Sequence, residues 1–111
     1  MKFKNIKLGA IEWEVKFGDI PDYIAEALET EPENLLGATD KSELTIYIRD
    51  NLKPTIARTT LLHELVHVMC DSFNLGFDDN EHEEIVDAIA KATYNFLHQN
   101  RIATEWLMKE E

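Results

Sequence analysis

Residues 54–73, PTIARTTLLHELVHVMCDSF, contain the pattern that decides the fold. Apolar residues recur there at spacings of three and four, which is the period of a helix with one apolar face. We therefore predict a long helix over about residues 54–75, with Gly76 as its left-handed C-terminal cap. The apolar positions are Leu61, Leu62, Leu65, Val66, Met69 and Phe73.

A second long helix is predicted over about residues 80–99. The preceding segment Asp78-Asp79-Asn80 carries side chains that are typical of helix N-caps. The tail, residues 101–111, is expected to form a final short helix that either docks or frays, since it contains apolar residues such as Trp106. The apolar face of the second helix consists of Ile85, Val86, Ile89, Ala90, Thr93, Phe96 and Leu97.

The N-terminal part, residues 1–50, has the pattern of strands with one short helix. Apolar and charged residues alternate over residues 11–17, as they do in a strand with one buried face. Ile6 and Leu8 continue this alternation towards the N-terminus. Gly9-Ala10 suit the turn between the two strands, so the sequence predicts a hairpin.

A short helix is expected after the hairpin. It would begin at Asp19 and Pro21 and end near Glu31-Pro32, because the residue before a proline is disfavoured in helical conformation. Its apolar face would consist of Tyr23, Ile24, Ala27 and Leu28.

A further strand is predicted from Leu44 to Arg49. Residues 37–42 before it have turn chemistry, and Leu35 and Leu36 are expected to begin a short strand. Strands followed by two long packed helices indicate an α+β fold with a small antiparallel or mixed sheet. One face of the predicted strand carries Leu44, Ile46 and Ile48.

Composition limits the functions open to the chain. Its 111 residues suit a single domain, and 44% hydrophobic residues are enough for one core. A net charge of -11 disfavours nucleic acid and anionic membrane surfaces as partners. With one cysteine there is no internal disulfide, and the N-terminus lacks the apolar run of a signal peptide. We therefore expect a cytoplasmic protein whose oligomeric state is open.

The long helix predicted over about residues 54–75 contains His63-Glu64-Leu65-Val66-His67, an H-E-x-x-H motif. Residues four apart lie on one face of a helix, so both imidazoles can bind one zinc ion. Glu64 lies on the adjacent flank, where it can act as a general base towards a water molecule on the metal. The alternative is that the two histidines line a helix edge without a metal.

Two imidazoles need a third ligand, and the start of the second helix supplies candidates. His82 lies near the centre of the apolar stripe and Glu84 almost opposite, whereas Glu83 lies on a flank, as His63 and His67 do. Glu83 is therefore favoured, and its alternative role is a capping box with Asn80. His82 and Cys70 remain alternative ligands. Asp87, one turn after Glu83, is expected to accept a hydrogen bond from a ligating imidazole.

The segment Thr59-Thr60-Leu61-Leu62-His63-Glu64-Leu65-Val66-His67 resembles the T-L-L-H-E-[IL]-x-H segment of small phage and prophage metallopeptidase-like proteins of the zincin class. Residues 83–90, EEIVDAIA, are similar to that family's E-x-x-V-[DE]-x-[LI]-A stretch. Residues 96–100, FLHQN, resemble its L-R-[DQ]-N ending.

This resemblance implies a minimal zincin-like fold with the motif histidines and a glutamate as ligands. Carried over by position, His63, His67 and Glu83 bind zinc, Glu64 is the base, and Asp87 supports a ligand. No residue clearly matches the tyrosine or histidine that stabilises the oxyanion in larger zincins; Tyr94, Tyr47 and Arg49 are the candidates here.

The leading hypothesis is therefore a zinc peptidase that acts on an extended peptide or protein chain. The predicted strand Leu44–Arg49 would offer its edge to that chain. The second hypothesis is a catalytically inactive, metal-binding interaction module, whose acidic surface binds a partner.

Overall fold

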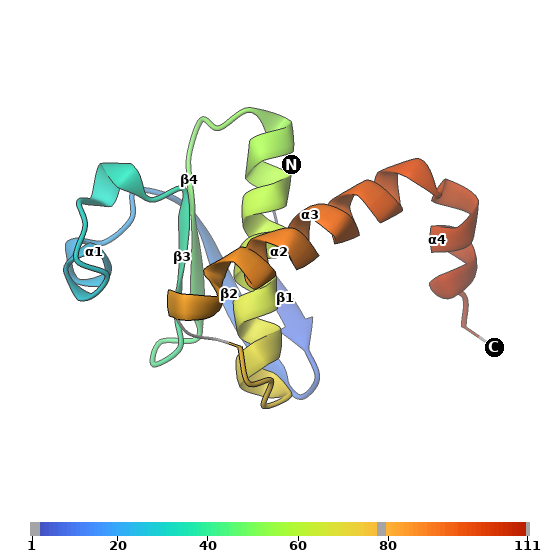
Figure 1. Cartoon of the computed structure of the whole chain (residues 1–111), viewed down its shortest axis with the longest axis horizontal. Helices are drawn as coiled ribbons and strands as arrows, with labels where there is room; N and C mark the ends of the chain where they lie inside the picture. The colour runs from blue at the N-terminus through green and yellow to red at the C-terminus, as the bar shows by residue number, and fades with distance from the viewer. Residues whose placement is uncertain (1–2, 78–79, 111) are drawn as a thin grey trace.

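The computed structural model describes residues 3–77 and 80–110 and has the expected α+β architecture. Four strands and a short helix come first, and the long helices follow, so the predicted fold class is confirmed (Figure 1). The elements are β1 (Asn5–Leu8), β2 (Ile11–Gly18), α1 (Asp22–Ala27), the 3-10 helix η1 (Pro32–Asn34), β3 (Gly37–Asp40), β4 (Thr45–Arg49), α2 (Pro54–Ser72), the 3-10 helix η2 (Asn80–His82), α3 (Glu83–Gln99) and α4 (Arg101–Leu107).

The sheet is mixed and has the strand order β1-β2-β4-β3. β1 and β2 form the predicted antiparallel hairpin, and Gly9 at its turn has a φ of 63°, a conformation that glycine adopts readily. β2 and β4 are parallel, so the chain crosses between them through α1, η1 and β3. β3 then pairs antiparallel with β4 and forms one edge of the sheet.

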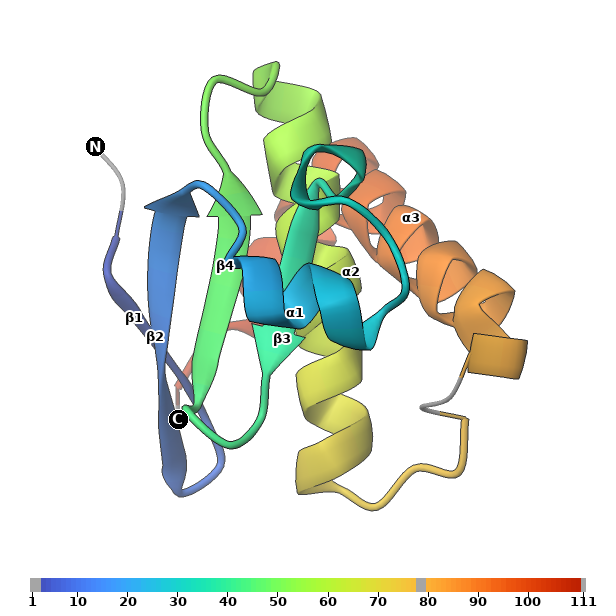
Figure 2. The ribbon, with the colours of Figure 1, turned by 90° about the vertical axis from the view of Figure 1, so that its left-hand side faces the viewer.

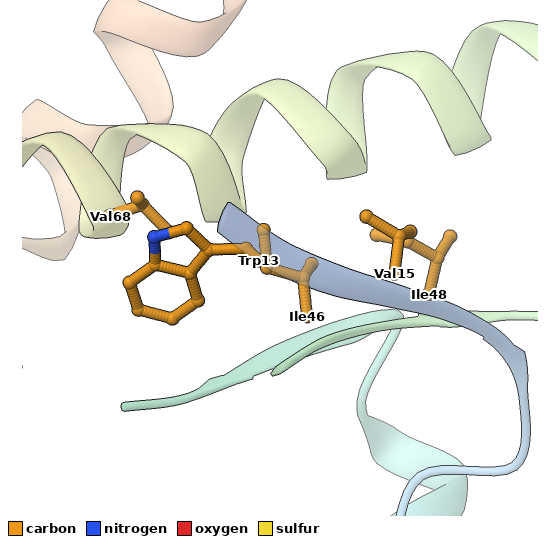
Figure 3. Packing of buried hydrophobic residues seen from close by; sticks show 5 residues of the cluster. All are labelled: Trp13, Val15, Ile46, Ile48 and Val68. Carbon is orange, nitrogen blue, oxygen red and sulfur yellow. The ribbon is translucent and has the colours of Figure 1, made fainter. Parts of the chain in front are cut away.

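The main core lies between the sheet and α2. Trp13 and Val15 of β2, Ile46 and Ile48 of β4, and Val68 of α2 are all buried there (Figure 3). α1 covers the opposite face of the sheet (Figures 1 and 2). That smaller cluster consists of Ile20, Ile24 and Ala38, with Leu35 and Tyr47 packed against it.

α2 is covered on two sides, because α3 packs against the side that faces away from the sheet (Figure 2). Leu61, Leu65 and Val68 contact the sheet, whereas Val66 and Cys70 contact α3. The single apolar stripe predicted from the sequence is therefore two separate faces. Its last predicted member, Phe73, is not part of either face and is 59% exposed.

The C-terminal cap of α2 differs from the prediction. The helix ends at Ser72, and the residue with left-handed backbone conformation is Asn74, with a φ of 54°, rather than Gly76. The amide of Leu75 then donates to the carbonyl of Cys70 at 2.9 Å and closes the end of the helix. Asparagine tolerates this conformation because its short polar side chain can bond locally.

The region around β3 is the main correction to the predicted fold. Residues 37–40 form a strand, although residues 37–42 were expected to be a turn, and Leu35 and Leu36 lie before it. Leu44 has a φ of 49° and precedes β4, so it is not part of that strand. β4 lies between β2 and β3, and the prediction that it offers a free edge is wrong because β3 occupies that edge.

The helix ends also differ from the predictions. α1 ends at Ala27, because Glu29 takes a φ of 57° and the amide of Thr30 bonds to the carbonyl of Ala25. Of its predicted apolar face only Ile24 is buried. The predicted cap residues Asp78 and Asp79 lie outside the described residues.

α3 has a buried face only in its first half. Val86 and Ala90 are buried against α2, whereas Phe96 and Leu97, expected on the same face, are 41% and 39% exposed. α4 forms as a helix but buries none of its residues. Within the described parts of the chain, no helix combines the length and the apolar character needed to cross a bilayer.

Candidate metal centre

Two consecutive long helices bring three metal-binding side chains together. His63 and His67 lie one turn apart on α2, with ring centroids 5.1 Å from each other. Glu83, the first residue of α3, places Oε1 2.5 Å from Nε2 of His63 and Oε2 3.4 Å from Nε2 of His67. The three candidate ligand atoms all lie within 4.8 Å of one another.

This arrangement fits a small divalent ion such as zinc. Zinc binds nitrogen and carboxylate oxygen at about 2.0–2.2 Å, which places two ligands of a tetrahedral site roughly 3.3 Å apart. The contact between His63 and Glu83 is shorter than that, and the half-exposed Glu83 side chain has room to move back when an ion binds.

His63 is held from both ring nitrogens. Its Nε2 faces Glu83, and its Nδ1 lies 3.5 Å from Oδ1 of Asp87. Asp87 also pairs with Lys91 at 2.7 Å, and that contact is the main reason why its pKa is lowered. An ionised carboxylate at Nδ1 orients the imidazole with Nε2 towards the candidate site, which is the role expected for Asp87.

Glu64 lies beside the three candidate ligands and is only 6% exposed. Burial raises the pKa of its carboxyl, while a hydrogen bond from Thr39 and the nearby His67 and His63 oppose the increase. The Thr39 hydroxyl donates to Oε1 at 2.8 Å, which leaves the second oxygen outside this bond. A carboxylate with a raised pKa and a fixed orientation is well suited to accept a proton.

A groove of about 610 Å³ opens in front of these residues. β3 forms one wall through Gly37, Ala38 and Thr39, while α2 and the first turns of α3 form the other walls. Glu64 and the three candidate ligands all line it. Its apolar lining includes Leu28, Leu35, Leu36 and Ile56.

The alternative ligands lie outside this cluster. His82 precedes α3, and it is not among the described residues whose ligand atoms converge. Cys70 lies on α2 one turn beyond His67, but it is 3% exposed and packs with Val66, Val86 and Ala90. The structure therefore brings Glu83, rather than His82 or Cys70, to the two motif histidines.

None of the three candidate oxyanion stabilisers lines the groove. Tyr94 lies three turns along α3 from Glu83 and stacks on His98, with ring centroids 4.1 Å apart. Tyr47 packs on the face of the sheet opposite α2. Arg49 is on that same face and donates to the carbonyls of Leu35 and Pro32, so its guanidinium anchors the chain before β3.

Sequence reasoning did not identify Thr39 and Gly37 as residues of the site. Gly37 allows β3 to approach α2, because a Cβ there would lie 2.7 Å from Cγ2 of Thr60 and 3.3 Å from Cγ of Glu64. Thr39 reaches Glu64 across 25 positions in the sequence. The sequence signal for this strand was an alternation in which Ala38 and Asp40 face one side and Gly37 and Thr39 the other. Glycine and aspartate are typical of turns, so the alternation was not recognised as a strand.

No protein-family model, curated protein or solved structure matches the chain. A function must therefore be argued from the residues of the groove and their geometry.

Proposed function

We propose that this chain is a zinc-dependent hydrolase, specifically a peptidase that cleaves an extended polypeptide. The observation that carries the proposal is the convergence of His63, His67 and Glu83 next to the buried carboxylate of Glu64. Three protein ligands that leave a further coordination position are typical of catalytic rather than structural zinc sites. The resemblance of residues 59–67 and 83–90 to small zincin-class proteins of phages and prophages agrees with this proposal, and we propose a cytoplasmic location for the protein.

Each side chain of the site has a separate role in the proposed reaction. His63, His67 and Glu83 would hold the zinc ion, which would supply a Lewis acid for the water and for the carbonyl under attack. Glu64 accepts the proton of the attacking water and later returns it to the leaving amine. Thr39 keeps the Glu64 carboxylate in position, and Asp87 keeps the His63 ring in position.

The free edge of β3 offers a place for the substrate. Gly37, Ala38 and Thr39 line the groove along the strand whose other side pairs with β4. An extended chain could add to this edge through backbone hydrogen bonds, with its scissile bond brought next to Glu64. This arrangement favours a polypeptide over a small, compact substrate.

The substitution Glu64→Gln tests the proposal, because it keeps the shape of the side chain and removes the base. We expect zinc-loaded protein to cleave fluorescently labelled, unfolded casein, and the Glu64→Gln variant to lose at least ~100-fold of that rate while it retains zinc. Glu84→Gln on the exposed side of α3 is the matched control and should retain activity. Equal cleavage by Glu64→Gln and wild type would contradict the proposed role.

One observation favours the second candidate, a metal-stabilised interaction module without turnover. Among the described residues that line the groove there is no tyrosine or arginine to stabilise an oxyanion. In that case neither the wild type nor Glu64→Gln cleaves any chain, although both bind zinc and a partner in the groove. Stable capture of an uncleaved peptide by zinc-loaded wild type would support the module.

A further inference from the structure

We propose that the groove selects polypeptide segments in which a large apolar side chain is flanked by lysine or arginine. This inference rests on the proposed function, in which the groove binds an extended chain, and it specifies the chemistry of that chain. It follows from the exposed apolar side chains that line the groove and from the charges of the hollow next to it.

The apolar lining of the groove includes side chains that the fold leaves uncovered. Leu28, Leu36 and Ile56 are 50%, 47% and 39% exposed, and all three line the groove. They come from three separate segments, the end of α1, the approach to β3 and the first turn of α2. Because apolar side chains that gather in a groove gain free energy when they are covered, a large apolar residue of the bound segment fits here.

Three carboxylates lie in a hollow next to the groove. Glu26, Glu29 and Glu31 line a smaller hollow of about 430 Å³, which shares Asn34 with the groove. All three carboxylates are exposed, and none of them takes part in an ion pair with a lysine or arginine of the described chain. The sequence from residue 17 to residue 40 contains seven acidic residues and no lysine or arginine.

The two lysines of the groove do not offset these charges. Lys91 pairs with Asp87 at 2.7 Å, and Lys41 lies 3.9 Å from Asp71 at the opposite end of β3. The negative charge of Glu26, Glu29 and Glu31 therefore lies beside the groove, where it attracts a cationic side chain and repels an acidic one.

Direct binding measurements test this inference without turnover. The probes are fluorescein-labelled, flexible peptides of equal length with a central Lys-Leu-Lys, Glu-Leu-Glu or Lys-Ala-Lys, and the protein is the zinc-loaded Glu64→Gln variant. We expect the Lys-Leu-Lys peptide to bind at least ~10-fold more tightly than Glu-Leu-Glu, because several weak charge pairs at the surface add up. Replacing the central leucine with alanine should also weaken binding, and added salt should reduce the charge preference.

Two triple variants with the same net charge show which carboxylates cause the preference for the Lys-Leu-Lys peptide. Glu26→Gln/Glu29→Gln/Glu31→Gln should remove most of the preference for Lys-Leu-Lys. Glu12→Gln/Glu14→Gln/Glu105→Gln, which has the same net charge but changes residues outside the groove, should leave the preference intact. Equal loss in both triples, or equal binding of Lys-Leu-Lys and Glu-Leu-Glu, would overturn the inference.

The outcome separates this inference from the proposed function. Zinc uptake and casein cleavage without a charge preference would overturn the inference alone. Failure to take up zinc would contradict the proposed function, while the anisotropy of the same peptides on metal-free protein would still decide the charge preference.

Discussion

At the scale of single residues, two buried carboxylates that both accept hydrogen bonds from hydroxyl groups have pKa shifts in opposite directions. Glu64 and Asp40 both accept a hydrogen bond from a side-chain hydroxyl, from Thr39 at 2.8 Å and from Tyr23 at 2.6 Å. Burial dominates at Glu64 and raises its pKa. Hydrogen bonds from Tyr23 and Ser42 dominate at Asp40 and lower its pKa. Glu64 is therefore suited to exchange a proton, whereas Asp40 is suited to stabilise the turn after β3.

The low pKa of Asp40 predicts a stability contribution that depends on pH. A carboxyl whose pKa is lower in the folded state stabilises the fold above its unfolded pKa of about 3.9, and this contribution is lost as the pH falls through the folded value. Tyr23→Phe removes the largest cause of the shift. Its loss of unfolding free energy should be clear at pH 7 and shrink below about pH 4, as measured by urea unfolding.

Tyr94→Phe is the control for this prediction, because Tyr94 stacks on His98 and does not contact Asp40. Its effect should be the same at both pH values. A Tyr23→Phe effect that does not change with pH would contradict the proposed link to Asp40.

At the scale of elements, the short strand β3 connects the fold to the site. It forms a wall of the groove, supplies Thr39 to Glu64 and lies against α2 at Gly37. The cap of the turn that follows comes from Asp40, whose Oδ1 accepts hydrogen bonds from the backbone and side chain of Ser42. Small changes in β3 should therefore alter both stability and the position of Glu64.

Gly37→Ala tests the close approach of β3 to α2. The added methyl group would lie 2.7 Å from Cγ2 of Thr60, so we expect a loss of about 1–3 kcal/mol of unfolding free energy. Gly76→Ala is the control, because no described atom lies within 4 Å of its added methyl group. Adding Thr60→Ser, which removes the clashing methyl, should restore part of the loss. Equal stability of the two alanine variants in urea would contradict this packing.

The same strand shows why the sequence predicted some elements and not others. β2 and β4 alternate clearly, because burial of one face dictates their residues, and α2 is marked by apolar spacings of three and four although two of its faces are covered. In β3, glycine and aspartate are turn formers, and the strand exists because tertiary packing outweighs their propensity. His63, His67 and Glu83 could be selected from helical spacing, whereas Thr39 could not, because its contact with Glu64 depends on how the sheet packs against α2.

At the scale of the whole molecule, α1, the sheet, α2 and the first half of α3 form successive layers, whereas the chain after them extends away (Figure 1). In the described part of the chain, α4 contains no buried residue, and Trp106 is 69% exposed. The stability of the domain should therefore depend on the layers and very little on α4.

Two tryptophan variants test this difference. Trp13→Ala, in the main core, should cost about 3–5 kcal/mol of unfolding free energy, because it removes a fully buried side chain. Trp106→Ala should change that free energy by less than about 0.5 kcal/mol. A loss of several kcal/mol for Trp106→Ala in dilute protein would show that α4 is covered in solution.

The central claim is that His63, His67 and Glu83 bind one divalent ion, and zinc titration of protein purified without a histidine tag tests it most directly. We expect one zinc ion per chain. Glu83→Ala should weaken binding by well over ~10-fold, since even groups that only orient ligands contribute 10–100-fold, while Glu84→Ala should bind as the wild type does. Less than ~0.1 equivalent of zinc after titration, or equal affinity of the two variants, would contradict the account.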